Sequence, residues 1–89
     1  SSNNVIEFLQ SEGYIRFKAD SEASSKALYE AYQRWCEDNA QKPMSANRLS
    51  SELAQNESLY NVEATNNVYA AGKRVRGFIG VEVLSLLPY

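Results

Sequence analysis

The sequence has 89 residues, a formal net charge of −2 and a pI of about 5.1, and 44% of its residues are hydrophobic. This length allows one small domain, and the lack of an apolar run of about 18 residues excludes a membrane-spanning helix. The sequence holds no His and one Cys, so zinc sites, Cys-His or Ser-His catalysis and an internal disulfide lack their residues. We therefore expect no enzyme activity in this chain, no metal and no cofactor.

The first elements are short. Asn3 or Asn4 can cap a helix that carries Val5, Ile6, Phe8 and Leu9 and stops at Gly13. The weak alternation of residues 14–17 predicts a short strand or an extended connection, and the polar run 18–23 predicts a loop. Because the chain starts without an initiator Met or an apolar leader, we expect residues 1–89 to be one domain cut from a longer protein.

The segment LYEAYQRWCEDN, Leu28 to Asn39, predicts a long helix capped by Ser24 or Ser25. Apolar side chains recur there every three or four positions and form one stripe, made of Ala27, Leu28, Ala31, Tyr32, Trp35 and Cys36. We expect this stripe to be core. A lone Cys within it suggests a packed, reduced thiol and a cytoplasmic protein.

A second helix follows a short break. Pro43 removes an amide donor and disfavours helical dihedral angles just before it, so the first helix ends by residue 41. Ser45 then caps a helix that runs to about Asn56. Its narrow apolar stripe consists of Ala46, Leu49, Ser50, Leu53 and Ala54, whereas Asn47, Arg48, Ser51 and Gln55 point away. Two helices across a tight turn predict a helix-turn-helix.

The last third of the chain predicts two strands, residues 59–64 and 75–84, joined by a long polar tip over residues 65–73. Alternation in the second strand places Val75, Ile79, Val81 and Val83 on one face and Arg74, Arg76, Phe78 and Glu82 on the other. We interpret Gly77 and Gly80 as a bulge or a close backbone approach. The expected fold is α+β: a small winged helix-turn-helix domain with three helices and a C-terminal β-hairpin wing.

Three segments carry a family resemblance: LYEAYQRWCEDN, KPMSANRLSSEL and GKRVRGFIGVEV. With them the chain, from about Val5 to Leu84, resembles the C-terminal winged-helix module of phage- and plasmid-type replicative primase-helicases, superfamily 3 proteins related to the poxvirus primase-helicase. The sequence departs from that pattern at Ala40, where Gly is expected, and at Leu49, where an aromatic is more usual. The resemblance implies a nucleic-acid-binding appendage to an ATP-driven helicase or primase motor that lies upstream in the parent chain.

Candidate DNA-contacting side chains fall into two groups. On the second helix, Asn47 and Arg48 lie near the helix start, where base edges are reached, and Ser45 offers a phosphate its hydroxyl and free amides. On the hairpin, three cations within four residues suit a phosphate backbone. Ordinary wet-face residues and charges that protect a strand edge are the alternative interpretations. The expected DNA-binding residues are Lys42, Ser45, Asn47, Arg48, Ser51, Lys73, Arg74 and Arg76.

These observations favour a DNA-binding module that positions a replicative primase or helicase on its template or origin, with duplex DNA preferred over single strands. The acidic pI supports an alternative, a protein-interaction or oligomerisation module whose contacts would be Tyr29, Phe78, Leu86, Leu87 and Tyr89. A third possibility is that the wing alone binds single-stranded DNA through Tyr69 or Phe78 stacked on bases.

Overall fold

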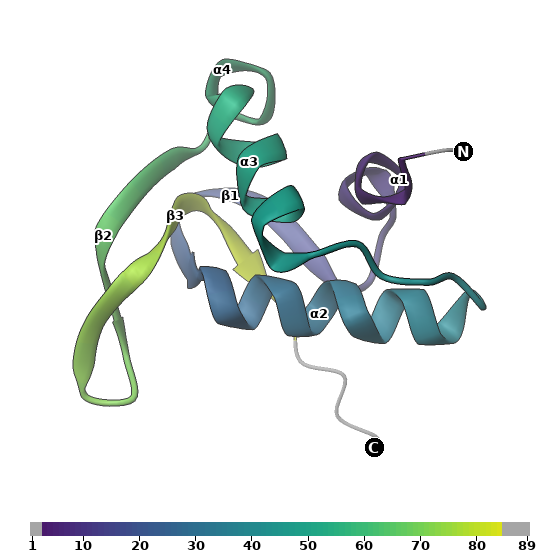
Figure 1. Ribbon diagram of the computed structural model, residues 1–89. Coiled ribbons are helices and arrows are strands. Elements are labelled where there is room, and N and C mark those ends of the chain that lie inside the picture. The colour runs from purple at the N-terminus through teal and green to yellow at the C-terminus, as the bar shows by residue number, and fades with distance from the viewer. Residues whose placement is uncertain (1–2, 85–89) are drawn as a thin grey trace.

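Four helices and one antiparallel sheet make up the computed structural model, which describes residues 3–84 (Figure 1). In chain order the elements are α1 (Asn4–Gln10), β1 (Ile15–Ser24), α2 (Ser25–Asp38), α3 (Ala46–Gln55), α4 (Glu57–Tyr60), β2 (Glu63–Ala70) and β3 (Lys73–Val83). The strand order is β1-β3-β2, so β3 is central. The protein is thus α+β, and the far end of the β2–β3 hairpin extends away from the helices.

The three longer helices start where the sequence predicts, because each has a polar cap. The Asn3 side chain accepts a hydrogen bond from the amide of Val5, and Ser24 accepts one from Ala27. Ser45 accepts one from the amide of Arg48 at 3.2 Å. Each bond satisfies an amide that the helix itself leaves without a partner.

The predicted stripe on α2 is the centre of the core. Its large side chains are at most 6% exposed, and they pack with residues of α1, α3 and the sheet, including Phe8, Leu49, Leu53 and Phe78. Cys36 is a free thiol that is 1% exposed, and burial raises its pKa. The prediction of a packed cysteine is therefore confirmed.

A buried polar cluster holds the start of α3 against α1 and α2. The Tyr32 hydroxyl donates to Asn4 Oδ1 at 2.5 Å and accepts from the Met44 amide at 2.8 Å. Asn4 Nδ2 in turn donates to the carbonyl oxygen of Lys42 at 3.0 Å. Because these bonds tie the α2–α3 connection to the core, the orientation of α3 is fixed before its first turn.

The prediction of a loop over residues 18–23 is wrong, because these residues belong to β1. The strand pairs with β3 on both sides of an irregularity between Phe17 and Glu22, where Asp20 takes a positive φ of 67°. A bulged edge strand leaves many side chains in water, so its sequence is polar and resembles a loop.

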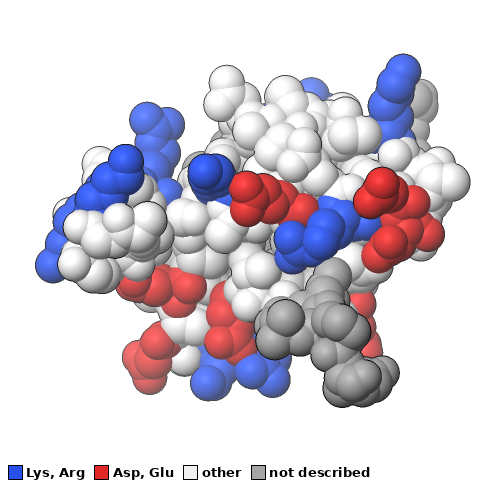
Figure 2. Space-filling view, turned by 90° about the horizontal axis from the view of Figure 1, so that it is seen from below, with Lys and Arg blue, Asp and Glu red and all other residues white. Residues whose placement is uncertain are grey.

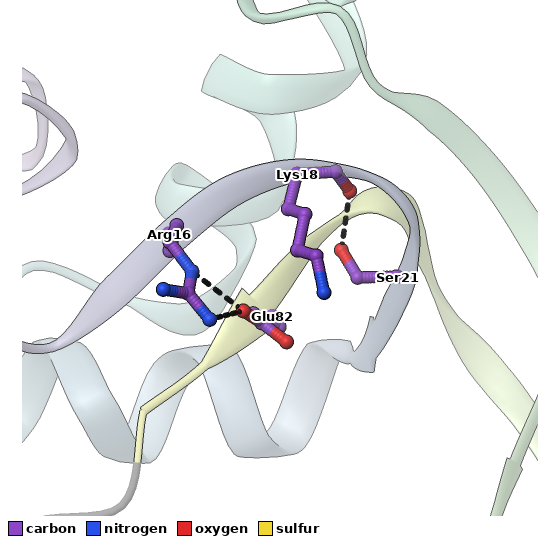
Figure 3. Close-up of polar contacts among 4 residues, drawn as sticks. All are labelled: Arg16, Lys18, Ser21 and Glu82. Carbon is purple, nitrogen blue, oxygen red and sulfur yellow. Dashed lines mark hydrogen bonds and ion pairs between the residues drawn. The ribbon is translucent and has the colours of Figure 1, made fainter.

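Polar side-chain contacts lie at this bulge and on the strand beside it (Figure 3). Arg16 lies opposite Glu82 and forms an ion pair with it, with Nη2 and Oε2 2.5 Å apart. The Ser21 hydroxyl donates to the carbonyl oxygen of Lys18 at 2.5 Å and closes the bulge. Since the Arg16 side chain is 59% exposed, the pair contributes little to stability.

The hairpin differs from the prediction in its first strand and in its tip. Residues 57–60 form α4, so residues 59 and 60 of the predicted strand 59–64 are helical, and Asn61 ends that helix with a φ of 57°. β2 therefore begins at Glu63, and the predicted long tip is a two-residue turn. Ala71 and Gly72 both have positive φ, the backbone of a tight turn that matches the twist of its strands.

The two faces of β3 do not alternate as predicted. Phe78 is 3% exposed and lies in the core, whereas Ile79 is 38% exposed. Gly80, with a φ of +99°, inserts an irregularity that returns Val81 to the core. At Gly77 the backbones of two segments meet, since a Cβ there would lie 2.2 Å from the Ala23 carbonyl oxygen. The interpretation of both glycines as strand features is confirmed.

Candidate nucleic-acid interface

The polar face of α3 and the cap residue Ser45 together carry four of the predicted DNA-binding residues. Leu49 and Leu53 anchor the helix in the core, so the opposite side faces outward. A shallow hollow of about 430 Å³ lies on that side, lined by Met44, Ser45, Asn47, Arg48 and Ser51. All four predicted residues are exposed. The helix thus presents amide, guanidinium and hydroxyl groups close together, the groups that pair with base edges and phosphates.

The C-terminal half of α3 carries an acidic residue, whereas the hollow at the start of the helix has none. Arg48 and Ser51 also line a second hollow, with Asn3, Glu52 and Gln55. The Glu52 carboxylate accepts hydrogen bonds from Asn56 Nδ2 at 3.2 Å and from the Tyr60 hydroxyl at 3.4 Å. Burial, and then this carboxylate, raises the pKa of Tyr60. A polyanion would therefore meet attractive or neutral groups at the start of α3 and an acid farther along.

The β2–β3 hairpin carries the other predicted cations. Lys73, Arg74 and Arg76 are all exposed. The Arg74 guanidinium lies 5.6 Å from the centre of the Tyr69 ring and donates to the Asn67 carbonyl oxygen at 3.4 Å. Figure 2 shows Lys and Arg side chains gathered on the hairpin at the left, whereas both signs alternate over the rest of that face. The positive charge is therefore local, although the chain is net negative.

A groove of about 590 Å³ connects α3 to the hairpin. α3 contributes Ala46, Asn47 and Ser50, and β3 contributes Val75 and Arg76. The third wall belongs to α2 and consists of Ser25, Lys26, Tyr29, Glu30 and Gln33. Because Asn47 lines both this groove and the hollow on α3, the predicted helix residues and Arg76 share one continuous surface.

Two residues are placed in ways that the sequence did not predict. Lys42 is exposed in the α2–α3 connection, but it lines neither the hollow nor the groove. Lys26 lies in the groove wall, and sequence reasoning missed it. A Lys on the wet face of a helix is ordinary, and only the packing of α2 against β3 brings this one opposite Arg76.

The contacts expected of a protein-interaction module are only partly exposed. Phe78 is a core residue, and Tyr29 is half-buried with its hydroxyl donating to the Met44 carbonyl oxygen at 2.8 Å. Phe78 is therefore not available to stack on bases either, whereas Tyr69 is 63% exposed. Leu86, Leu87 and Tyr89 lie outside the described residues.

Over residues 3–84 we find no group of three or more His, Cys, Asp or Glu side chains placed to hold a metal ion. No helix in that part of the chain is both long and apolar enough to cross a membrane.

The family model described as "Poxvirus D5 protein-like" matches residues 1–78. The matched region includes all of α2, α3 and β2 and the three hairpin cations. No curated protein and no solved structure matches the chain.

Proposed function

Because the chain belongs to the poxvirus D5 protein-like family, we propose that it is the winged-helix DNA-binding module of a replicative primase-helicase. The module positions the motor of the parent chain on its template or origin, in the cytoplasm. Its direct partners are duplex DNA and the upstream helicase or primase domains. The family match and the resemblance in the sequence support the replicative role, and the geometry of the surface supports the contact with DNA.

The order of elements supports the winged-helix assignment. A helix-turn-helix needs two successive helices, the second of which presents its polar face. α2 and α3 have this order, although residues 39–45 connect them and the expected tight turn is absent there. A wing needs a hairpin that leaves the domain beside that helix. The β2–β3 hairpin does so. Its strand β3 is the central strand of the sheet and pairs with β1, which connects the hairpin to the core.

One observation carries the proposal: the polar face of α3 and Arg76 of the hairpin open onto a single surface, which is continuous through Asn47. In this mode Asn47, Arg48 and Ser51 enter the major groove, where Asn47 and Arg48 read base edges, and Ser45 bonds to a flanking phosphate. The remaining cations, Lys42, Lys73, Arg74 and Arg76, contact phosphates along the backbone.

Fluorescence anisotropy with labelled duplex and single-stranded oligonucleotides tests the proposal at two salt concentrations. We expect salt-dependent duplex binding, because each neutralised phosphate adds about −0.9 to the slope of log affinity against log salt. The Arg74→Ala, Arg76→Ala double variant should bind more weakly, and its slope should be shallower by about 1.8, which is two phosphates at that increment.

Lys18→Ala is the matched control, because it removes an exposed charge from the β1 bulge rather than from the hairpin. It should leave duplex binding unchanged. Absence of duplex binding at low salt and high protein concentration contradicts the proposal. If the double variant binds as the wild type does, the hairpin arginines are not part of the DNA interface.

A further inference from the structure

The groove between α2, α3 and β3 has cations on two of its three walls. Lys26 projects from the first turn of α2, and Arg76 lies on β3 across the groove. Both residues are exposed, and no ion pair is found for either within residues 3–84. Glu30, also exposed, is the acid on the lining. Two cations against one acid give the groove a positive balance in a chain of net charge −2.

The rest of the lining combines apolar and polar groups. Tyr29, Ala46 and Val75 supply carbon surface, whereas Gln33, Asn47 and Ser50 supply amide and hydroxyl groups. A sugar–phosphate backbone alternates in the same way, because deoxyribose rings present C–H groups between charged phosphates. Phosphates bind the cations and hydrogen-bond donors, and the sugar rings pack on the carbon surface.

The position of the groove matches the surface that binds duplex DNA in the proposed function, on which this inference rests. Asn47 is shared between the groove and the hollow on α3, so a strand whose base edges meet α3 continues into the groove. Arg76 is then held beside α2, whereas Arg74 lies against Tyr69. The hairpin cations are therefore not equivalent.

We propose that this groove holds the sugar–phosphate backbone of one DNA strand and that Lys26 is a phosphate-contacting residue, opposite Arg76. Glu30 weakens the same contact by repelling the phosphates. Lys26 thus extends the interface from α3 and the hairpin onto α2, so three elements enclose one strand.

The test is duplex affinity of single variants across a salt series, measured by anisotropy. Lys26→Ala should weaken binding equally for different duplex sequences and make the salt slope shallower by about 1, as expected for a phosphate contact. Glu30→Gln should tighten binding, with a gain that shrinks as salt screens the groove. Lys26→Arg keeps the charge and should preserve the wild-type slope.

Lys18→Ala is again the control, and thermal unfolding of each variant verifies that the fold is intact. If Lys26→Ala and Glu30→Gln bind as the wild type does while Arg74→Ala, Arg76→Ala binds weakly, this inference is overturned and the proposed function stands. If the wild type binds no duplex, the proposed function fails and this inference fails with it. Weakening by Lys26→Ala for one duplex sequence alone also overturns it, because a phosphate contact carries no sequence information.

Discussion

Gly77 shows how a single residue sets the shape of the sheet. It lies where β3 pairs with Ser24 on one side and Thr65 on the other. A Cβ at this position would lie 2.2 Å from the Ala23 carbonyl oxygen and 2.8 Å from Val68 Cγ2. No rotamer change relieves a clash with backbone, so the close approach of the strands requires glycine.

Gly77→Ala should lower the free energy of unfolding by about 3 kcal/mol or more, because the backbone of β1 has to shift. The matched variant is Gly72→Ala at the hairpin turn. There φ is +79° and a Cβ meets nothing within 4 Å, so only the strained φ remains, at about 1 kcal/mol. Urea denaturation measures both. Equal losses would contradict the close approach at Gly77.

At the scale of elements, the hydroxyl of Tyr32 joins three segments. Tyr32 lies on α2. Its hydroxyl donates to Asn4 Oδ1 of α1 and accepts from the amide of Met44, just before α3. The Tyr29 hydroxyl makes one bond nearby, to the Met44 carbonyl oxygen, from a half-buried position. The angle at which α3 leaves the core therefore depends more on Tyr32 than on Tyr29.

Tyr32→Phe should destabilise the fold by about 2 kcal/mol, since it leaves two groups without their partner: Asn4 Oδ1 in a buried bond and the Met44 amide in a part-buried one. Tyr29→Phe, the matched variant, should cost about 1 kcal/mol or less, because it removes a single, part-buried hydrogen bond rather than two. Chemical denaturation gives both values. A larger loss for Tyr29→Phe would contradict the central role of the Tyr32 hydroxyl.

Helices were predicted better than strands, and the reason is physical. The apolar stripes of α2 and α3 and the caps at Asn3, Ser24 and Ser45 are local patterns, so they can be recognised from the sequence alone. β1 and β2 are held by backbone bonds to β3, and few of their side chains are buried. Polar strands of this kind resemble loops, and their pairing cannot be inferred from alternation.

The residues of the candidate site also divide into those that a local sequence pattern predicts and those whose position depends on packing. The candidate residues on α3 and the hairpin could be predicted because each group is contiguous in the sequence. Lys26 could not, because its position opposite Arg76 depends on how α2 packs against the bulged sheet. Similarly, Phe78 was assigned to the open face because the irregularity at Gly80 leaves no signature in hydrophobic alternation.

At the scale of the whole molecule, one core joins nearly every element. It contains residues of α1, β1, α2, α3 and β3, and Trp35 belongs to it at 6% exposed. Phe8, Tyr32 and Trp35 contact one another through their rings. Since no part of this core can open without exposing the rest, the described portion of the chain should unfold as a unit.

Urea unfolding should therefore be two-state, with an m-value of about 1 kcal/mol per molar urea for a domain of this size. Trp35 is the single Trp, so its fluorescence reports the core, and far-ultraviolet circular dichroism reports the helices and sheet. The two transitions should coincide. Loss of the fluorescence signal at lower urea than the dichroism signal would contradict a single cooperative core.

Because Cys36 is buried, this chain is well suited to site-specific labelling at introduced cysteines. Maleimide reagents attack exposed thiolates, whereas this thiol is 1% exposed and burial raises its pKa. Cysteines introduced by Ala71→Cys at the hairpin turn and Glu7→Cys on α1, both exposed positions, would then be the reactive pair in the folded protein. Fluorophores attached there would report by energy transfer whether the distance between the hairpin and α1 changes when DNA is added, with the native thiol left in place.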